Sequence, residues 1–355
     1  MTGGFKFQLK SKRLQYEILI KRKITRITGE SAKGKSELVR ALEDAGNLYA
    51  KIDIQCDYEC YVLNNNLFKE IVRSNINRAR NETASHGSAG FAEKLRSLLK
   101  QYDNILFFAD ESFSMACSDE FSLFCKFTDS FFVLINRSGL PNLPYSYTDI
   151  YNIKTSGKFH WIEPVYNQEN FNVFRESATI ITEDSNSGFE FFNRFYSCVK
   201  PAGGKSNIIQ LLENVTGTVV IVADGAAFGS EIEILTEKIA KMQDVVLLFL
   251  PESFEYLLLS SGLFKNTEVQ KKIKEPVSQV SGLFFSWEQF FTYVIKKYTE
   301  RYPCCYSKHK LNKCYLEDCC FREVSVCCLS RMTDKKEAVL GKYLEMGDCP
   351  RLNIF

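Results

Sequence analysis

The feature that most constrains this chain is a glycine-rich loop between a predicted strand and a predicted helix. The segment KITRITGESAKGKSEL, residues 23–38, contains the pattern G-x-x-x-x-G-K-S, formed by Gly29, Gly34, Lys35 and Ser36. KITRIT before the loop is typical of a strand, and SELVRALEDAG after it has apolar residues at helical spacing. A loop in this setting wraps a phosphate group with its backbone N–H groups and the positive end of the helix. The sequence therefore predicts an α/β fold with a phosphate site near its amino end.

The residue types assign a role to positions along the loop. Lys35 is expected to reach the β- and γ-phosphates of a nucleotide, and Ser36 is expected to ligate Mg²⁺. The predicted ligands are ATP and Mg²⁺, and the alternative is a degenerate loop that no longer binds nucleotide. The predicted nucleotide-binding residues of the loop are Gly29, Glu30, Ser31, Ala32, Lys33, Gly34, Lys35, Ser36 and Glu37.

Two later strands are expected to complete this site. NILFFADES places Asp110 and Glu111 directly after an apolar run, and SFFVLINRS ends in Asn136 and Arg137. Short runs of this kind are typical of strands buried on both faces of a parallel sheet. Asp110 is predicted to hold the metal ion through water, and Glu111 to orient an attacking water. The alternatives are ordinary strand-end acids and, for Asn136, a turn residue.

Together these segments resemble the additional-strand class of P-loop ATPases, which includes the AAA, RecA-like and ABC-like groups. The long separation between Lys35 and Asp110 leaves room for an intervening strand, and in that class a glutamate often follows the aspartate. The resemblance implies that Asn136 is a polar sensor of the γ-phosphate and that Arg137 is a weaker candidate for charge stabilisation. The chain has no LSGGQ signature, so the resemblance does not extend to dimers of the ABC type.

A second acidic site is predicted in the following part of the chain. Glu183 follows the strand-like TIIT, Asp224 follows VVIVA, and Glu252 follows LLFLP, with Glu255 close behind. Acidic groups at the carboxyl ends of parallel strands face the crevice where ligands bind. Carboxylates from successive strands can share Mg²⁺ and act on a phosphodiester. Glu183, Asp224 and Glu252 are therefore predicted metal ligands, and strand-end acids of an unrelated α/β unit are the alternative.

At these residues the segment resembles a Toprim-like domain of the kind found with ATPases in OLD-type nucleases and PARIS-type phage-defence systems. The likeness covers about a quarter of the chain. It implies an acid at the end of the first strand, as Glu183 is, and an aspartate at the end of a later one, as Asp224 is. The chain departs from the D-x-D pattern of such domains because Ala226 stands at the second position. This departure leaves a non-catalytic relative open.

The predicted organisation is a P-loop domain with a mainly parallel sheet over residues 1–170, a smaller α/β domain over 175–265, and a helical cysteine-rich region over 280–355. AGGKS at 202–206 lacks the first glycine of a phosphate loop and is interpreted as the start of a helix, with a contact to phosphate or a nucleic-acid backbone as the alternative. The cysteine cluster is interpreted as structural thiols, with zinc binding and redox sensing as the alternatives. It comprises Cys304, Cys305, Cys314, Cys319, Cys320, Cys327 and Cys328, with His309 among them.

Charge and hydropathy narrow the partners and the location. The net charge is only +2, so the overall charge does not argue for a nucleic-acid coat, although basic residues crowd the first thirty positions. They form either a solvated hairpin surface or a surface that meets a phosphate backbone, and they are Lys6, Lys10, Lys12, Arg13, Lys21, Arg22, Lys23 and Arg26. Without a secretory signal or a membrane span in the sequence, we expect a cytoplasmic protein that is not a membrane partner.

The sequence favours a Mg²⁺-dependent ATPase that switches the linked Toprim-like domain or a partner. One rival is a metal-dependent nuclease or defence effector gated by ATP, in which Glu183 and Asp224 do the chemistry. Another is a nucleotide switch without hydrolysis that scaffolds an assembly. A nucleoside triphosphate is the predicted small-molecule partner, and a nucleic acid, a protein partner or a second copy of the chain stay open.

Overall fold

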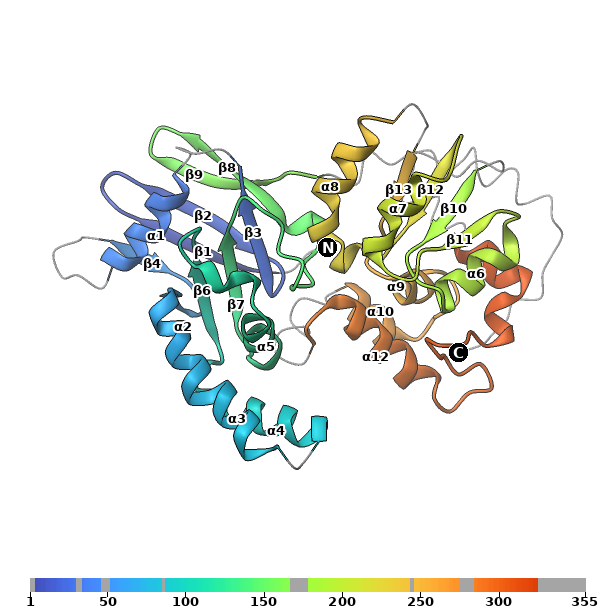
Figure 1. Ribbon diagram of the computed structural model, residues 1–355, viewed down its shortest axis with the longest axis horizontal. Helices are drawn as coiled ribbons and strands as arrows, with labels where there is room; N and C mark the ends of the chain where they lie inside the picture. Colours follow the sequence, from blue (N-terminus) through green and yellow to red (C-terminus); the bar gives the residue numbers. More distant parts are fainter. Residues whose placement is uncertain are drawn as a thin grey trace. The chain divides into compact units, whose positions relative to one another are not determined.

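The chain folds into two compact α/β units, which confirms the α/β part of the predicted fold class (Figure 1). The computed structural model describes residues 4–29, 34–45, 52–84, 87–166, 178–242, 246–274 and 284–324. Unit 1 comprises Met1–Tyr166 with Pro276–Ser286, and unit 2 comprises Asn167–Glu275 with Trp287–Phe355. The predicted C-terminal region is thus grouped with unit 2 from Trp287 onward.

Unit 1 is built on a sheet that has nine strands in the described residues, in the order β4-β1-β2-β9-β8-β3-β7-β6-β5. The pairs β1–β2, β1–β4 and β8–β9 are antiparallel, and the other five are parallel, so the sheet is mainly parallel as predicted. The strands are β1 (Phe5–Lys10), β2 (Gln15–Ile20), β3 (Ile24–Thr28), β4 (Asp53–Gln55), β5 (Glu59–Val62), β6 (Ile105–Ala109), β7 (Phe131–Ile135), β8 (Ile150–Ser156) and β9 (Phe159–Pro164).

The strand order brings the predicted motifs together. β7 lies between β3 and β6, with Ile24 opposite Phe132 and Leu106 opposite Phe131 in parallel register. The glycine loop follows β3, and Asp110 follows β6. Parallel strands have their carboxyl ends at the same edge of a sheet. The carboxyl ends of β3, β7 and β6 therefore lie side by side at one edge.

One face of this sheet packs on α1 (Lys35–Asp44). The apolar stripe of α1, formed by Leu38, Val39 and Leu42, is buried in a cluster with Phe7 and Ile18 of the sheet. The remaining helical segments of unit 1 are α2 (Asn65–Ile71), a π-helical segment (Val72–Asn77), α3 (Arg78–Glu82), α4 (Gly87–Leu99), α5 (Asp119–Phe127) and short 3₁₀ turns at Lys100–Tyr102, Ser114–Cys117 and Tyr147–Asp149.

Unit 2 contains a sheet of four strands in the described residues, all parallel, in the order β11-β10-β12-β13. The strands are β10 (Thr179–Thr182), β11 (Val199–Pro201), β12 (Val219–Val222) and β13 (Val246–Phe249). The helices are α6 (Ser187–Phe195), α7 (Ile208–Leu212), α8 (Gly229–Ile239), α9 (Phe254–Ser260), α10 (Thr267–Lys274) and α12 (Trp287–Thr299), with 3₁₀ turns at Lys205–Asn207, Gly225–Ala227 and Lys313–Leu316. The apolar stripe of α12 is buried, and this helix packs against α9.

Several elements differ from the sequence-based expectation. The hairpin of β8 and β9 comes after the segments in which α/β alternation was predicted. The short strands β5 and β11 were also not indicated by the sequence pattern. Many residues of these strands are exposed, polar or half-buried, so their sequences lack the apolar runs from which strands were predicted. None of the described helices is long and apolar enough to span a membrane.

Candidate functional site

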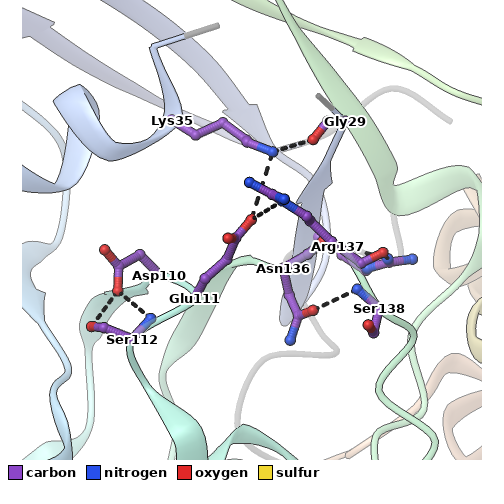
Figure 2. A network of polar contacts seen from close by, with 9 residues as sticks. Gly29, Lys35, Asp110, Glu111, Ser112, Asn136, Arg137 and Ser138 are labelled. Atoms are coloured by element: carbon purple, nitrogen blue, oxygen red, sulfur yellow. Dashed lines mark hydrogen bonds and ion pairs between the residues drawn. The ribbon is translucent and has the colours of Figure 1, made fainter. Parts of the chain in front are cut away.

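A pocket of about 260 Å³ lies at the carboxyl ends of β3, β6 and β7 in unit 1. The start of α1 forms one wall, and the turns after β6 and β7 form another (Figure 2). Its lining residues are Gly34, Lys35, Ser36, Glu37, Asp110, Glu111, Ile135 and Arg137. The structure therefore gathers residues from all three predicted motifs at one pocket. Glu30, Ser31, Ala32 and Lys33 lie outside the described residues.

The two loop glycines adopt backbone conformations that disfavour other residues. Gly29 has φ 107° and Gly34 has φ 83°, in the left-handed region. A Cβ atom on Gly34 would lie 2.8 Å from the hydroxyl oxygen of Tyr16, which donates a 2.7 Å hydrogen bond to the Gly34 carbonyl. The Tyr16 ring stacks on His160, with ring centroids 4.4 Å apart. Gly34, at the end of the loop, is thus held against β2 and β9 by Tyr16 and His160.

Lys35 points across the pocket from the first position of α1. Its side chain is 7% exposed, and its Nζ donates a hydrogen bond to the Gly29 carbonyl (Figure 2). The same Nζ lies 3.8 Å from Glu111 Oε1. A nearly buried ammonium needs nearby oxygens to offset its lost hydration, and these two groups provide them.

Glu111 lies between two cations. Its Oε1 accepts a 3.0 Å charge-assisted hydrogen bond from Arg137 Nε and faces Lys35, as Figure 2 shows. Glu111 and Arg137 both have side chains about half exposed, so the pair faces the opening of the pocket. An anion that entered the pocket would meet the same ammonium and guanidinium groups that now hold this carboxylate.

Asp110 and Asn136 are held by local turns. Asp110 Oδ1 accepts hydrogen bonds from the backbone N–H and the hydroxyl of Ser112, the former at 2.9 Å. Asn136 Oδ1 accepts a 2.7 Å hydrogen bond from the Ser138 N–H, and Asn136 is absent from the lining of this pocket in the described residues. The Ser36 hydroxyl and the Asp110 carboxylate offer oxygen donors, which suit Mg²⁺.

Arg26 on β3 was expected at the surface with the other basic residues, and that expectation is wrong. Its side chain is 0% exposed, and Nη2 donates hydrogen bonds to the carbonyls of Asn136 and Arg137, the latter at 2.9 Å. Arg26 therefore shapes the turn that presents Arg137. Lys23 is also buried, and its burial lowers its pKa to about 8. A charged residue inside the apolar pattern of KITRIT was the available signal.

Unit 2 contains a smaller cavity of about 90 Å³ at the carboxyl ends of β10 and β12. Glu183 and Asp224, predicted from separate strand ends, both line it. The Asp224 N–H donates a 2.9 Å hydrogen bond to Glu183 Oε2, and Asp224 Oδ1 accepts one of 3.1 Å from the N–H of Phe254 at the start of α9. Asp184 accepts hydrogen bonds from the N–H groups of Gly188 and Phe189, so it stabilises the start of α6.

The third acid of this cavity is Glu255 of α9. Glu252 is 6% exposed and is not among the described residues that line the cavity. Glu255 is 1% exposed, and its Oε1 accepts a 2.8 Å hydrogen bond from the Tyr306 hydroxyl. Glu255 Oε2 has no hydrogen-bond partner within the described part of the chain. Glu288 and Lys308 complete the charged lining. Sequence spacing gave no signal for either because both come from the C-terminal region.

Burial and the charges of neighbouring side chains shift the pKa values of the ionisable groups that line this cavity. Burial raises the pKa of Glu183 to about 7, against a hydrogen bond from Asp224 that lowers it. Burial and the charges of Glu288, Glu183 and Glu255 raise the pKa of Asp224 well above its ordinary value. Burial alone would lower the pKa of Lys308, but Glu255, Glu288 and Asp224 raise it above its ordinary value. The cavity therefore favours bound protons or cations.

The predicted cysteine cluster is partly described. Cys304, Cys305, Cys314, Cys319 and Cys320 are not joined in disulfides within the described residues, and Cys327 and Cys328 lie outside them. Cys320 Sγ donates to the Cys314 carbonyl at 2.9 Å, and burial raises the pKa of Cys320 to about 12. In the described ranges, no three His, Cys, Asp or Glu side chains are grouped closely enough to hold a metal ion.

Lys205 of the AGGKS segment is engaged within unit 2. Its Nζ donates to the Ala227 carbonyl at 3.0 Å and to the Ser230 hydroxyl at 2.9 Å. The segment leads through a 3₁₀ turn into α7, in agreement with its interpretation as the start of a helix.

Comparison of the chain with models of protein families, with curated proteins and with solved structures gives no match.

Proposed function

We propose that unit 1 binds ATP with Mg²⁺ and hydrolyses it, and that this cycle switches unit 2 or a partner. The observation that carries the proposal is the pocket in which Lys35, Ser36, Asp110 and Glu111 lie together at the start of α1. An anion in this pocket would be met by the Lys35 ammonium, by Arg137 and by the positive end of α1. This donor set suits the β- and γ-phosphates of a nucleoside triphosphate.

The strand order supports the proposed class of enzyme. β7 lies between the strand that precedes the glycine loop and the strand that ends before Asp110. An inserted strand at this place is the feature after which the additional-strand class of P-loop ATPases is named.

The proposed reaction gives Glu111 the central role. The γ-phosphate would take the Lys35 ammonium and the Arg137 guanidinium as its counter-ions, which releases Glu111 from both. The freed carboxylate would then accept a proton from a water whose oxygen bonds to the γ-phosphorus, while the bond from that phosphorus to the bridging oxygen breaks. Mg²⁺, held through Ser36 and Asp110, would supply charge neutralisation at the phosphate oxygens.

Calorimetric titration with ATP in magnesium buffer tests nucleotide binding. We expect the wild-type protein to bind ATP, and Lys35→Ala to weaken binding by at least about 100-fold, since it removes a nearly buried charge from the phosphate site. Lys154→Ala, on the exposed part of β8, is the matched control and should bind as the wild type does. No heat from the wild-type protein would exclude the proposal. Tight binding without turnover would instead favour the non-hydrolysing switch.

A second function, metal-dependent cleavage of a phosphodiester, is proposed for unit 2. The observation that favours it is that Glu183, Asp224 and Glu255 line one cavity, in which the buried Glu255 Oε2 has no hydrogen-bond partner within the described residues. In the described arrangement these carboxylates are not grouped closely enough to share a metal ion, so metal binding would draw them together. These carboxylates are the oxygen donors that Mg²⁺ or Mn²⁺ prefers. Nicking of plasmid DNA or cleavage of tRNA that requires Mn²⁺ and is lost in Glu183→Gln would support this function. Cleavage that persists in that variant would exclude it.

A further inference from the structure

A segment from the C-terminal region, residues 306–311, lies beside the acidic cavity of unit 2, and we call it the strap. Four contacts hold it there. The Tyr306 hydroxyl hydrogen-bonds Glu255 Oε1 at 2.8 Å and lies 3.0 Å from the Ser187 hydroxyl. The Ser187 N–H donates to the Lys308 carbonyl at 3.3 Å, and the Leu311 N–H donates to Glu190 Oε2 at 2.6 Å. The strap is therefore anchored at its start, middle and end.

The strap places one ammonium group in the cavity. Lys308 lines the cavity, and its Nζ is paired with Glu288 Oε1. The two side chains are 30% and 27% exposed, so this pair is largely but not wholly withdrawn from water. Attraction to Asp224 and Glu255 acts on the same ammonium. Lys308 is thus the cation of the cavity in the arrangement that the structure describes.

The charges of the cavity are unequal. Among its described lining residues, Glu183, Asp224, Glu255 and Glu288 face it with Lys308 as their cation, and Asp184 is committed to the start of α6. Glu255 Oε2 has no hydrogen-bond partner in the same residues, although the side chain is 1% exposed. A buried carboxylate oxygen without a partner is costly and points to a further ligand. A cation of higher charge would balance the carboxylates better than one ammonium does.

We propose that Lys308 is a tethered cation that competes with a divalent metal ion for the acidic cavity of unit 2. The inference rests on the metal binding proposed above for this unit. A divalent ion that takes Glu288 as a ligand removes the partner of Lys308, and at Glu255 Oε2 it binds the same carboxylate whose Oε1 accepts from Tyr306. Occupancy of the cavity is thereby linked to the position of the strap, and the ammonium keeps the site closed until metal displaces it.

Binding of Mn²⁺ to the full-length protein without nucleotide tests the competition. Free Mn²⁺ is measured by electron paramagnetic resonance in the wild-type protein, in Lys308→Met and in Lys310→Met, whose lysine is exposed on the same strap. We expect Lys308→Met to bind one Mn²⁺ at least about tenfold more tightly than the wild type, and Lys310→Met to be unchanged. Adding Asp224→Asn to Lys308→Met should abolish the gain, which assigns it to this cavity.

A second measurement on the wild-type protein needs no substitution that could disturb folding. Acetic anhydride modifies exposed lysines, and mass spectrometry reports the rate at each position. We expect saturating Mn²⁺ to raise the rate at Lys308 at least about fivefold and to leave Lys310 unchanged.

The possible results separate the two proposals. Equal Mn²⁺ affinity in wild type and Lys308→Met, with an unchanged labelling rate at Lys308, overturns the competition but leaves metal binding in place. No Mn²⁺ binding in either protein overturns both.

Discussion

Glu111→Gln is expected to lower ATP turnover by at least about 100-fold while ATP binding is retained. The amide cannot accept a proton from water, and loss of a positioned general base costs about 10²–10⁴ in rate. The substitution also removes the negative charge that now neutralises Lys35 and Arg137, so the affinity for ATP should stay equal or rise. Steady-state phosphate release and calorimetric titration with ATP measure the two effects on the same preparation.

Glu43→Gln is the matched control for this substitution because Glu43 is exposed on α1 and does not line the pocket of unit 1 in the described residues. It should leave turnover and binding unchanged. Turnover in Glu111→Gln within a fewfold of the wild type would remove Glu111 from the mechanism. A parallel loss of binding would show that Glu111 shapes the pocket and does not activate water.

Glu183→Gln is expected to remove a loss of stability that unit 2 undergoes as the pH rises. The folded-state pKa of Glu183 is raised to about 7, so the folded protein binds this proton more tightly than the unfolded chain does. The free energy of unfolding should therefore fall as pH rises from about 4.5 toward 7, and the loss should be complete above pH 7. The shift corresponds to about 3 kcal/mol as an upper estimate. The neutral amide does not titrate, so the variant should gain on the wild type across this window.

Urea unfolding in EDTA, followed by Trp287 fluorescence, measures this effect. Trp287 is buried in unit 2, and Trp161→Phe in both proteins removes the signal of unit 1. Glu237→Gln, at an exposed position of α8, is the control and should run parallel to the wild type. Parallel curves for Glu183→Gln and the wild type between pH 4.5 and 8 would contradict the prediction.

The parts of the fold that the sequence indicates are those in which burial leaves an uninterrupted pattern. β6 and β7 are buried on both faces and read as continuous apolar runs, while α1 and α12 carry apolar stripes at helical spacing. The strands that escaped prediction are short or exposed. β5 alternates exposed and half-buried residues, and much of the β8–β9 hairpin is exposed, so neither has an apolar run to detect.

The site residues that could be predicted from the sequence are those next to strands with a clear apolar pattern. Lys35, Ser36, Asp110 and Glu111 were identifiable because each stands beside a strand that the sequence reveals. Their meeting at one pocket follows from the parallel order of those strands.

Residues that reach a site from elsewhere in the chain could not be identified in this way. Glu288 and Lys308 reach the cavity of unit 2 from α12 and the strap, and Arg26 acts through two carbonyl groups of the turn that follows β7. Their roles depend on packing between distant segments, which no local spacing encodes.

The position of Glu111 between Lys35 and Arg137 has a consequence for ligand choice. The pocket holds its own counter-charge, so chloride and other singly charged anions in solution gain little by entering it. A ligand must bring more negative charge than the one carboxylate it replaces. For the nucleotide site proposed above, we expect this exchange of charge to favour triphosphates over anions of lower charge, independently of contacts with base or sugar.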